Sequence, residues 1–189
     1  MMFEQSLCFI EELEKLKKIE RMNLVLGGER RENSAEHSWH SAMTLWVLKR
    51  YIPWEDVDYD KVIRMLLIHD IVEIDAGDVS LYDDAGRLAV QSAEQKGAER
   101  IFGLLPEEEG KEMLALWEEF EACETKEAKV ARAMDGFQPV VNYLLVKKRH
   151  HDVVVTKEQV MEKKALLKEV SPFLWEKLKT MIEESAAYV

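Results

Sequence analysis

The feature that most restricts how this chain can fold is an apolar segment, residues 65–73, that contains charged side chains. Its order is Met-Leu-Leu-Ile-His-Asp-Ile-Val-Glu, so one histidine and two acids stand among aliphatic residues. Burying an imidazole and a carboxylate is costly unless a partner compensates them, and a metal ion is a common partner of such a pair. Contact between His69 and Asp70, or with backbone groups at a helix end, is the alternative that a single dipeptide leaves open. The segment therefore predicts a buried polar site.

Composition and the spacing of apolar residues together predict an all-α fold. Apolar residues recur every three or four positions in several stretches, and the 189 residues include only eight glycines and four prolines. A chain of this length can form one sizeable core, so we expect a single domain over residues 1–189. The metal-site core should span about residues 34–140, with C-terminal helices in residues 156–187 packed on it. Helices are expected over residues 3–20, 36–48, 62–73, 88–105, 106–120, 126–148 and 157–170, and from residue 172 onward.

Two of these helices carry apolar stripes that should face the core. The first helix, residues 3–20, has Phe3 and Ile10 in its stripe, with glutamate and lysine outside. The second helix begins after Ser34, a plausible N-cap, and its stripe includes Trp39, Ala42 and Trp46. Burial of these side chains is therefore the expectation for both helices.

The central helix predicted over residues 62–73 gathers three polar side chains. It places Glu73 four residues after His69 and three after Asp70, so all three should point toward one place. Glu73 would then support a ligand or take part in proton transfer. In the polar turn that follows, Asp78 is near enough in sequence to return to the same place.

Two further stretches supply candidate ligands. His37 and His40 lie three residues apart, on neighbouring positions of one helical face, and a hydrogen-bonded histidine is the alternative for each. Asp135 stands on the apolar side of a long helix, and Pro139 cannot donate to the carbonyl four residues back, so a bend is expected at this acid. The candidate set offers two imidazoles and two carboxylates, which suit a borderline divalent ion: His37, His69, Asp70 and Asp135.

Charge and cysteine usage exclude several classes of function. The net charge is −11 and no lysine- or arginine-rich tract is present, which opposes binding to a nucleic-acid polymer. A small anionic substrate is compatible, because a metal and a few cations can outweigh the overall field. Cys8 and Cys123 are too few and too far apart for a disulfide framework, which fits a reducing cytoplasm. No export signal and no apolar run of about twenty residues is found, so we expect no membrane association.

Three spaced segments carry a resemblance to a known family. They are Asn-Ser-Ala-Glu-His at 33–37, Leu-Ile-His-Asp-Ile-Val-Glu at 67–73 with Gly77 and Asp78, and Asp-Gly-Phe-Gln-Pro at 135–139. The order of His, His-Asp and a distant Asp on a helical chain resembles the HD-domain metal-dependent phosphohydrolase superfamily. The segments are similar to its small single-domain branch, which includes bacterial 5′-deoxynucleotidases and human HD-domain-containing homologues. The likeness extends over nearly the whole chain.

The resemblance implies a divalent-metal-dependent phosphohydrolase. The implied substrate is a phosphate monoester, most of all a deoxynucleoside or nucleoside 5′-monophosphate, which would be cleaved to nucleoside and phosphate. The implied cofactor is one Mn²⁺ or Co²⁺ ion, with Mg²⁺, Zn²⁺, Fe²⁺ or Ni²⁺ as alternatives. The residues that the resemblance assigns to this ion are His37, His69, Asp70 and Asp135.

The same resemblance assigns roles to residues beside the ion. Arg21 matches the phosphate-binding arginine that follows the first helix, Glu73 would protonate the leaving oxygen or orient the water, and Asp78 would lie beside the substrate. Met22 stands where the nucleotidases have a tryptophan, and the loop before His37 is one residue longer, which leaves deoxyribose selectivity open. Many members of the branch are dimers, so we expect a homodimer.

Two other hypotheses follow from the same residues. A helical module could sense a nucleotide or a metal without turning anything over, although the presence of Glu73 and Asp78 beside a full ligand set opposes this. A helical interaction protein without a metal is the third, and one equivalent of tightly held metal per chain would exclude it.

Overall fold

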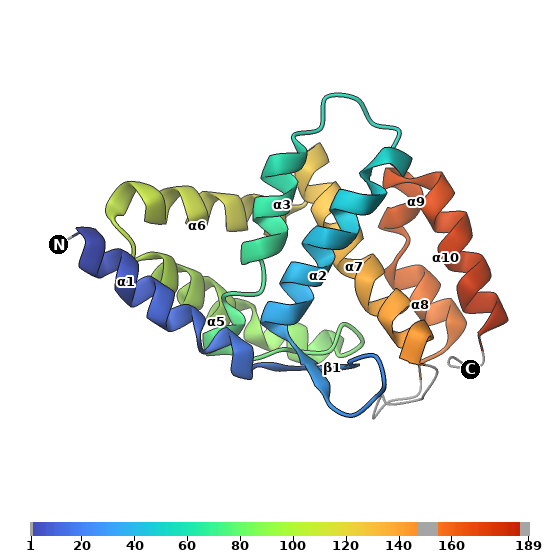
Figure 1. Ribbon diagram of the computed structural model, residues 1–189, viewed down its shortest axis with the longest axis horizontal. Coiled ribbons are helices and arrows are strands. Elements are labelled where there is room, and N and C mark those ends of the chain that lie inside the picture. Colours follow the sequence, from blue (N-terminus) through green and yellow to red (C-terminus); the bar gives the residue numbers. More distant parts are fainter. Residues whose placement is uncertain (1, 147–154, 186–189) are drawn as a thin grey trace.

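A computed structural model describes residues 2–146 and 155–185 of the protein. Helices α2, α3 and α7 lie at the centre, α1, α5 and α6 lie on one side of them, and α8, α9 and α10 lie on the other (Figure 1). The prediction of an all-helical fold is confirmed, with one small antiparallel hairpin added. The elements are α1 (Met2–Leu13), η1 (Leu16–Lys18), β1 (Glu20–Leu24), β2 (Arg31–Asn33), α2 (Ser34–Leu48), η2 (Lys49–Tyr51), α3 (Tyr59–Ile68), α4 (Glu73–Ala76), α5 (Asp84–Phe102), α6 (Glu107–Ala122), α7 (Lys126–Val146), α8 (Lys157–Lys163), α9 (Leu166–Val170) and α10 (Pro172–Glu184).

Side-chain caps fix where several helices begin. Asn33 caps α2, one residue before the predicted Ser34, and its Oδ1 accepts a hydrogen bond from the Glu36 amide at 3.0 Å. The Glu36 carboxylate accepts in return from the Asn33 amide, which completes a capping box. Thr156 and Ser171 cap α8 and α10, which begin at the predicted residues 157 and 172. The capping box at Asn33 sets the start of α2, and with it the position of His37 in the first turns of that helix.

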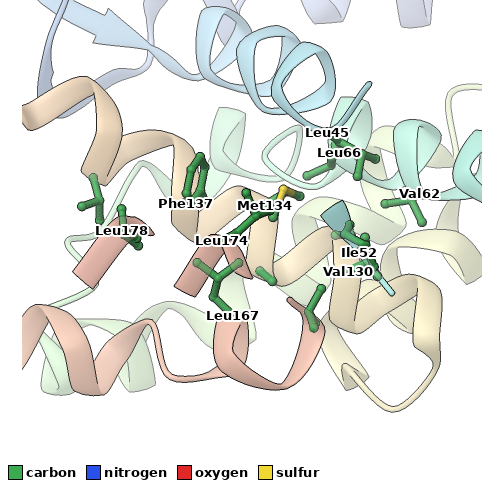
Figure 2. Packing of buried hydrophobic residues seen from close by; sticks show 14 of the residues in the cluster. Leu45, Ile52, Val62, Leu66, Val130, Met134, Phe137, Leu167, Leu174 and Leu178 are labelled. Carbon is green, nitrogen blue, oxygen red and sulfur yellow. The ribbon is translucent and has the colours of Figure 1, made fainter. Parts of the chain in front are cut away.

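The larger hydrophobic core surrounds α7. Side chains from α2, α3, α9 and α10 converge on those of α7, such as Met134, and they include Leu45, Leu66, Leu167 and Leu178 (Figure 2). A second cluster joins α1, α5 and α6 to the segment after α3. None of the helices in the described residues has a stretch long and apolar enough to span a bilayer. The segment after α3 therefore lies where the two clusters meet.

The N-terminal helix is shorter than predicted and turns a different face inward. It ends at Leu13, and the chain continues as the hairpin of β1 and β2 instead of one helix to residue 20. Phe3 and Ile10 are 75% and 59% exposed, whereas Phe9 and Glu12 are buried. Glu12 can be buried because its carboxylate pairs with Lys15 and with Arg100 from α5. An ion pair made across the fold thus overrides the apolar periodicity.

The stripe predicted on the second helix is right at Ala42 and wrong at both tryptophans. Trp39 and Trp46 are 61% and 59% exposed, while Ser38, Ser41 and Ala42 face α3 and α7. Small side chains allow the three central helices to approach closely, so the face of α2 that packs inward is the one with little side-chain volume. The aromatic face is left at the surface.

The central helix ends earlier than predicted. Helix α3 stops at Ile68, and residues 69–72 form turns before the short α4. Within these turns the Ile71 amide bonds to the Ile68 carbonyl and the Glu73 amide to the Asp70 carbonyl. His69, Asp70 and Glu73 therefore do not share one continuous helix, although the tight turns still keep them on one side of the chain. The predicted helix over residues 157–170 is likewise divided into α8 and α9.

Candidate metal centre

Four polar side chains meet where the ends of α2 and α3 approach α7. The Nε2 atom of His37 lies 2.9 Å from Asp135 Oδ1 and 3.9 Å from Asp70 Oδ2. The Nε2 atom of His69 lies 3.1 Å from Asp70 Oδ1 and 3.4 Å from Asp135 Oδ1. One ligand atom each from His37, His69 and Asp70 all fall within 4.8 Å of one another. Side chains 98 residues apart in the sequence thus share one locus.

The outer nitrogen of each imidazole is occupied, which determines its tautomer. His69 Nδ1 lies 2.9 Å from the Leu66 carbonyl oxygen, which can only accept, so Nδ1 carries the hydrogen. His37 Nδ1 lies 2.8 Å from Gln138 Oε1. The amide of Gln138 is oriented by its other end, because Nε2 donates to Glu32 Oε1 at 3.1 Å. Both histidines therefore turn Nε2, the nitrogen that a ligating histidine offers to a metal, toward Asp135.

One buried atom at this locus lacks a partner. His69 Nε2 is buried and forms no hydrogen bond with any described residue. Burial disfavours a charge on His69, but Asp70 and Asp135 outweigh it and raise the pKa of this imidazole to about 9. The field that would hold a proton here would hold a divalent cation more strongly. The donor set therefore fits a divalent metal.

Three acids and one arginine form the neighbouring wall. Arg21 Nη1, from β1, lies 2.7 Å from Asp70 Oδ2, 3.4 Å from Asp78 Oδ1 and 3.6 Å from Glu73 Oε1. Burial and the charges of Asp70 and Asp78 raise the pKa of Glu73 well above its usual range, although Arg21 opposes this. The Ser34 hydroxyl donates to Glu73 Oε2. Glu73 is thus a buried carboxyl group with a strong tendency to keep its proton.

Asp78 reaches the site through a glycine turn. Gly77 ends α4 with a φ of 76°, a left-handed conformation that costs glycine little. The turn brings Asp78 back toward Arg21, and burial raises its pKa. A cavity of about 160 Å³ opens here, and its wall includes Arg21, Asp70, Asp78 and Asp135.

Six of the seven residues that the sequence assigned to the site line this cavity, and the seventh, His37, contacts Asp135 from outside the lining. Asp135 lies on the same side of α7 as Gln138, one helical turn away, and both contact His37. Sequence reasoning assigned Gln138 no role, and it assigned Ser34 only that of an N-cap. The spacing of three residues between Asp135 and Gln138 is the signal that could have indicated a role for Gln138. The contact of Ser34 with Glu73 joins residues 39 apart, so it has no local signal in the sequence.

Comparison with known proteins places this geometry in context. A family model described as HD domain matches residues 13–175. The 5′-deoxynucleotidase HDDC2 of Dictyostelium discoideum is 31% identical over 144 residues, which cover 74% of this chain and 76% of that protein. The human 5′-deoxynucleotidase HDDC2 is 29% identical over 136 residues, which cover 71% of this chain and 65% of the human protein.

Solved structures agree with this similarity. The crystal structure of a predicted metal-dependent phosphohydrolase from Magnetospirillum magnetotacticum MS-1 has a TM-score of 0.89 and 38% identity, and covers 97% of this chain and 94% of its own. A conserved hypothetical protein from Pyrococcus furiosus has a TM-score of 0.69, with 92% of this chain and 99% of its own covered. Its 19% identity supports a shared fold alone.

Proposed function

This chain belongs to the HD-domain family, and on that premise we propose that it is a metal-dependent phosphohydrolase that releases phosphate from a nucleoside 5′-monophosphate. The observation that carries the proposal is the convergence of the Nε2 atoms of His37 and His69 on Asp135, with His69 Nε2 left without a hydrogen-bond partner among the described residues. The similarity to proteins named 5′-deoxynucleotidase supports the substrate class.

In this proposal four residues hold one divalent ion. His37 and His69 would bind through Nε2, and Asp70 and Asp135 through the carboxylate oxygens that already face those nitrogens. Mn²⁺ or Co²⁺ is the favoured ion, since borderline divalent metals accept mixed nitrogen and oxygen ligands. When bound, such an ion lowers the pKa of its water and polarises a phosphoryl oxygen.

The neighbouring wall would orient the ester and move its proton. Arg21 presents a cation on the cavity side of Asp70, where it can bind the phosphoryl oxygens and stabilise the charge they gain. Glu73 has the raised pKa that a general acid needs near neutral pH, so it can donate a proton to the leaving oxygen. Asp78 would hold the sugar or a water beside them.

We further propose a homodimer located in the cytoplasm. The support for the dimer is an exposed apolar face on α2, and for the location it is the scarcity of cysteine. Light scattering on wild type and on a Trp46→Glu variant tests the assembly, because a charge in a helical interface should halve the mass. An equal mass for both proteins would place the interface elsewhere or exclude it. The residues of this face are Trp39, Met43, Trp46 and Val47.

A phosphate-release screen tests the activity. Ribo- and deoxyribonucleoside 5′-monophosphates, sugar phosphates and an aryl phosphate are incubated with Mn²⁺, Co²⁺, Mg²⁺ or Zn²⁺, with metal content measured in parallel. We expect the nucleotides to be hydrolysed fastest, and His69→Ala to lose both metal and activity. Asp75→Asn is the matched control, because Asp75 pairs with Arg100 outside the cavity wall. Tight metal binding without phosphate release from any ester would favour the sensing module instead.

A further inference from the structure

A second cavity lies against the metal centre and has the opposite charge. Its volume is about 180 Å³, and the charged residues in its wall are four cations and one acid. The acid is Asp135, which already contacts His37 and His69. In a protein with a net charge of −11, a cavity with this balance is unusual. The four cations are Arg87, Arg132, Lys163 and Lys164.

Two of these cations form ion pairs with acids among the described residues. Arg132 from α7 pairs with Glu121 at 3.0 Å and lies over the Phe120 ring, and Lys163 pairs with Asp84. The side chains of Arg87 and Lys164 form no ion pair or hydrogen bond with any residue in the described ranges 2–146 and 155–185. Two positive charges are therefore available to a ligand in this cavity.

The two cavities share a wall, so one molecule could reach both. Arg87, Arg132, Lys164 and Asp135 line the first cavity as well as the second. Glu94 and Glu121, the acids that face these arginines, line the first cavity only. The second cavity is thus an extension of the active-site cavity in which cations outnumber acids.

The position of Lys164 depends on a break in the helices and on a glycine. The residue lies between α8 and α9, and its amine is 3.2 Å from the place where a Cβ on Gly136 would stand. Gly136 follows Asp135 directly, so the amine lies next to the α7 segment that supplies the proposed metal ligand. A larger residue at position 136 would push this amine away.

We propose, on the basis of the proposed function, that the second cavity binds a second phosphate group of the substrate. The preferred substrates would then be phosphate monoesters that carry another phosphate on the same molecule. Water attacks the phosphorus held at the metal centre, the ester P–O bond breaks, and the leaving oxygen takes a proton, which yields an alcohol and inorganic phosphate. The other phosphate stays intact and is held by Arg87 and Lys164, which raises the affinity without changing the bonds that break.

Matched substrate pairs test this proposal. Phosphate release with Mn²⁺ is measured for deoxyadenosine 5′-monophosphate and deoxyadenosine 3′,5′-bisphosphate, and for fructose 6-phosphate and fructose 1,6-bisphosphate. We expect kcat/KM to be at least tenfold higher for the bisphosphate of one pair. Preference within the nucleotide pair would place the second phosphate on a nucleotide, and preference within the fructose pair would place it on a sugar.

Variants of Lys164 then assign the preference to this cavity. Lys164→Met should lower the ratio of the two kcat/KM values about tenfold, Lys164→Arg should largely keep it, and the exposed Lys168→Met is the control that should leave it unchanged. Equal kcat/KM values within both pairs, or a preference that survives Lys164→Met and Arg87→Met together, would overturn the proposal while the hydrolase remains. If no ester releases phosphate, the proposed hydrolase function is wrong. Calorimetric titration of the bisphosphate into wild type and Lys164→Met then still decides whether this cavity binds it.

Discussion

Two arginines in this protein each contact several carboxylates, but they do so differently. Arg100 on α5 makes bonds of 2.6 and 2.8 Å to the two oxygens of Asp75 and a third of 2.6 Å to Glu12. Arg21 makes one close contact, at 2.7 Å to Asp70, while Asp78 and Glu73 lie 3.4 and 3.6 Å away. Arg100 is 44% exposed at its side chain and Arg21 only 15%. The better paired arginine is thus the one nearer to solvent.

The difference separates a structural ion pair from a site built for a ligand. Around Arg100 each acid has its partner, and the geometry is that of a bidentate guanidinium and carboxylate pair. Around Arg21 three acids gather, but of these only Asp70 accepts a hydrogen bond from the guanidinium, and the pKa of Glu73 is raised. An excess of buried negative charge is costly without a further cation, and it is expected where a metal and a phosphate ester bind.

The largest expected effect is on catalysis, and it should follow the removal of Arg21 but not that of Arg100. Arg21→Met should reduce kcat/KM for a nucleoside monophosphate by about 10²- to 10³-fold, because a cation that stabilises the transferring phosphoryl group is lost. Arg100→Met should keep kcat/KM within about threefold of wild type, since its partners lie outside the cavity wall. Steady-state phosphate release measures both. Similar losses in the two variants would remove the distinction between the two arginines.

Metal binding should stabilise the site more than any ion pair stabilises the surface. At a Mn²⁺ concentration about a hundredfold above Kd, the free energy of unfolding should rise by about 2.7 kcal/mol, because the folded state alone binds the ion. The rise should disappear in His37→Ala and persist in Asp75→Asn. Urea unfolding followed by circular dichroism, with and without Mn²⁺, measures it. An equal rise in His37→Ala would show that the ion binds elsewhere.

Removing Arg100 should lower the stability of the protein, although it should leave the activity intact. Glu12 is 8% exposed and keeps only Lys15 as a partner in Arg100→Met, so part of its desolvation is uncompensated. Because Arg100 is 44% exposed and screened by solvent, we expect a loss of only about 1–2 kcal/mol. Urea unfolding of the metal-free proteins measures it. A loss below about 0.3 kcal/mol, as is found for many exposed ion pairs, would show that the pairs of Arg100 do not stabilise the fold.

The smallest expected effect is on the pH dependence of stability. The hydrogen bond from Lys15 lowers the pKa of Glu12, burial opposes this, and Arg100 lowers it further. A lowered folded-state pKa stabilises the protein above the ordinary value of 4.5, and the stabilisation is lost as pH falls through the folded pKa. Wild type should therefore lose its advantage over Glu12→Gln only below about pH 4.5, with less than about 1 kcal/mol at stake. An advantage that grows on acidification would contradict the lowered pKa.

The sequence determined the helical class, most helix starts and the charged residues that gather at the cavity. Helix starts were predictable where a cap is local, as at Thr156 and Ser171, because the capping side chain and the amide it bonds are two or three residues apart. His69 and Asp70 stood out because charged groups in an apolar run need a partner, wherever that partner comes from. Their assignment as ligands together with His37 and Asp135 remains a prediction.

Tertiary packing alone decided which helix faces turn inward and which distant groups pair. The buried Glu12 and the exposed Trp46 both depart from what apolar periodicity predicts. The charge of Glu12 is compensated by Arg100, and Trp46 lies at the surface because the small side chains of α2 pack against the neighbouring helices. The contact of Gln138 with His37 and the cationic second cavity join α7 to elements far away in the sequence. Periodicity records only neighbours along one helix, so it carries no information about a charge or a volume supplied from another part of the chain.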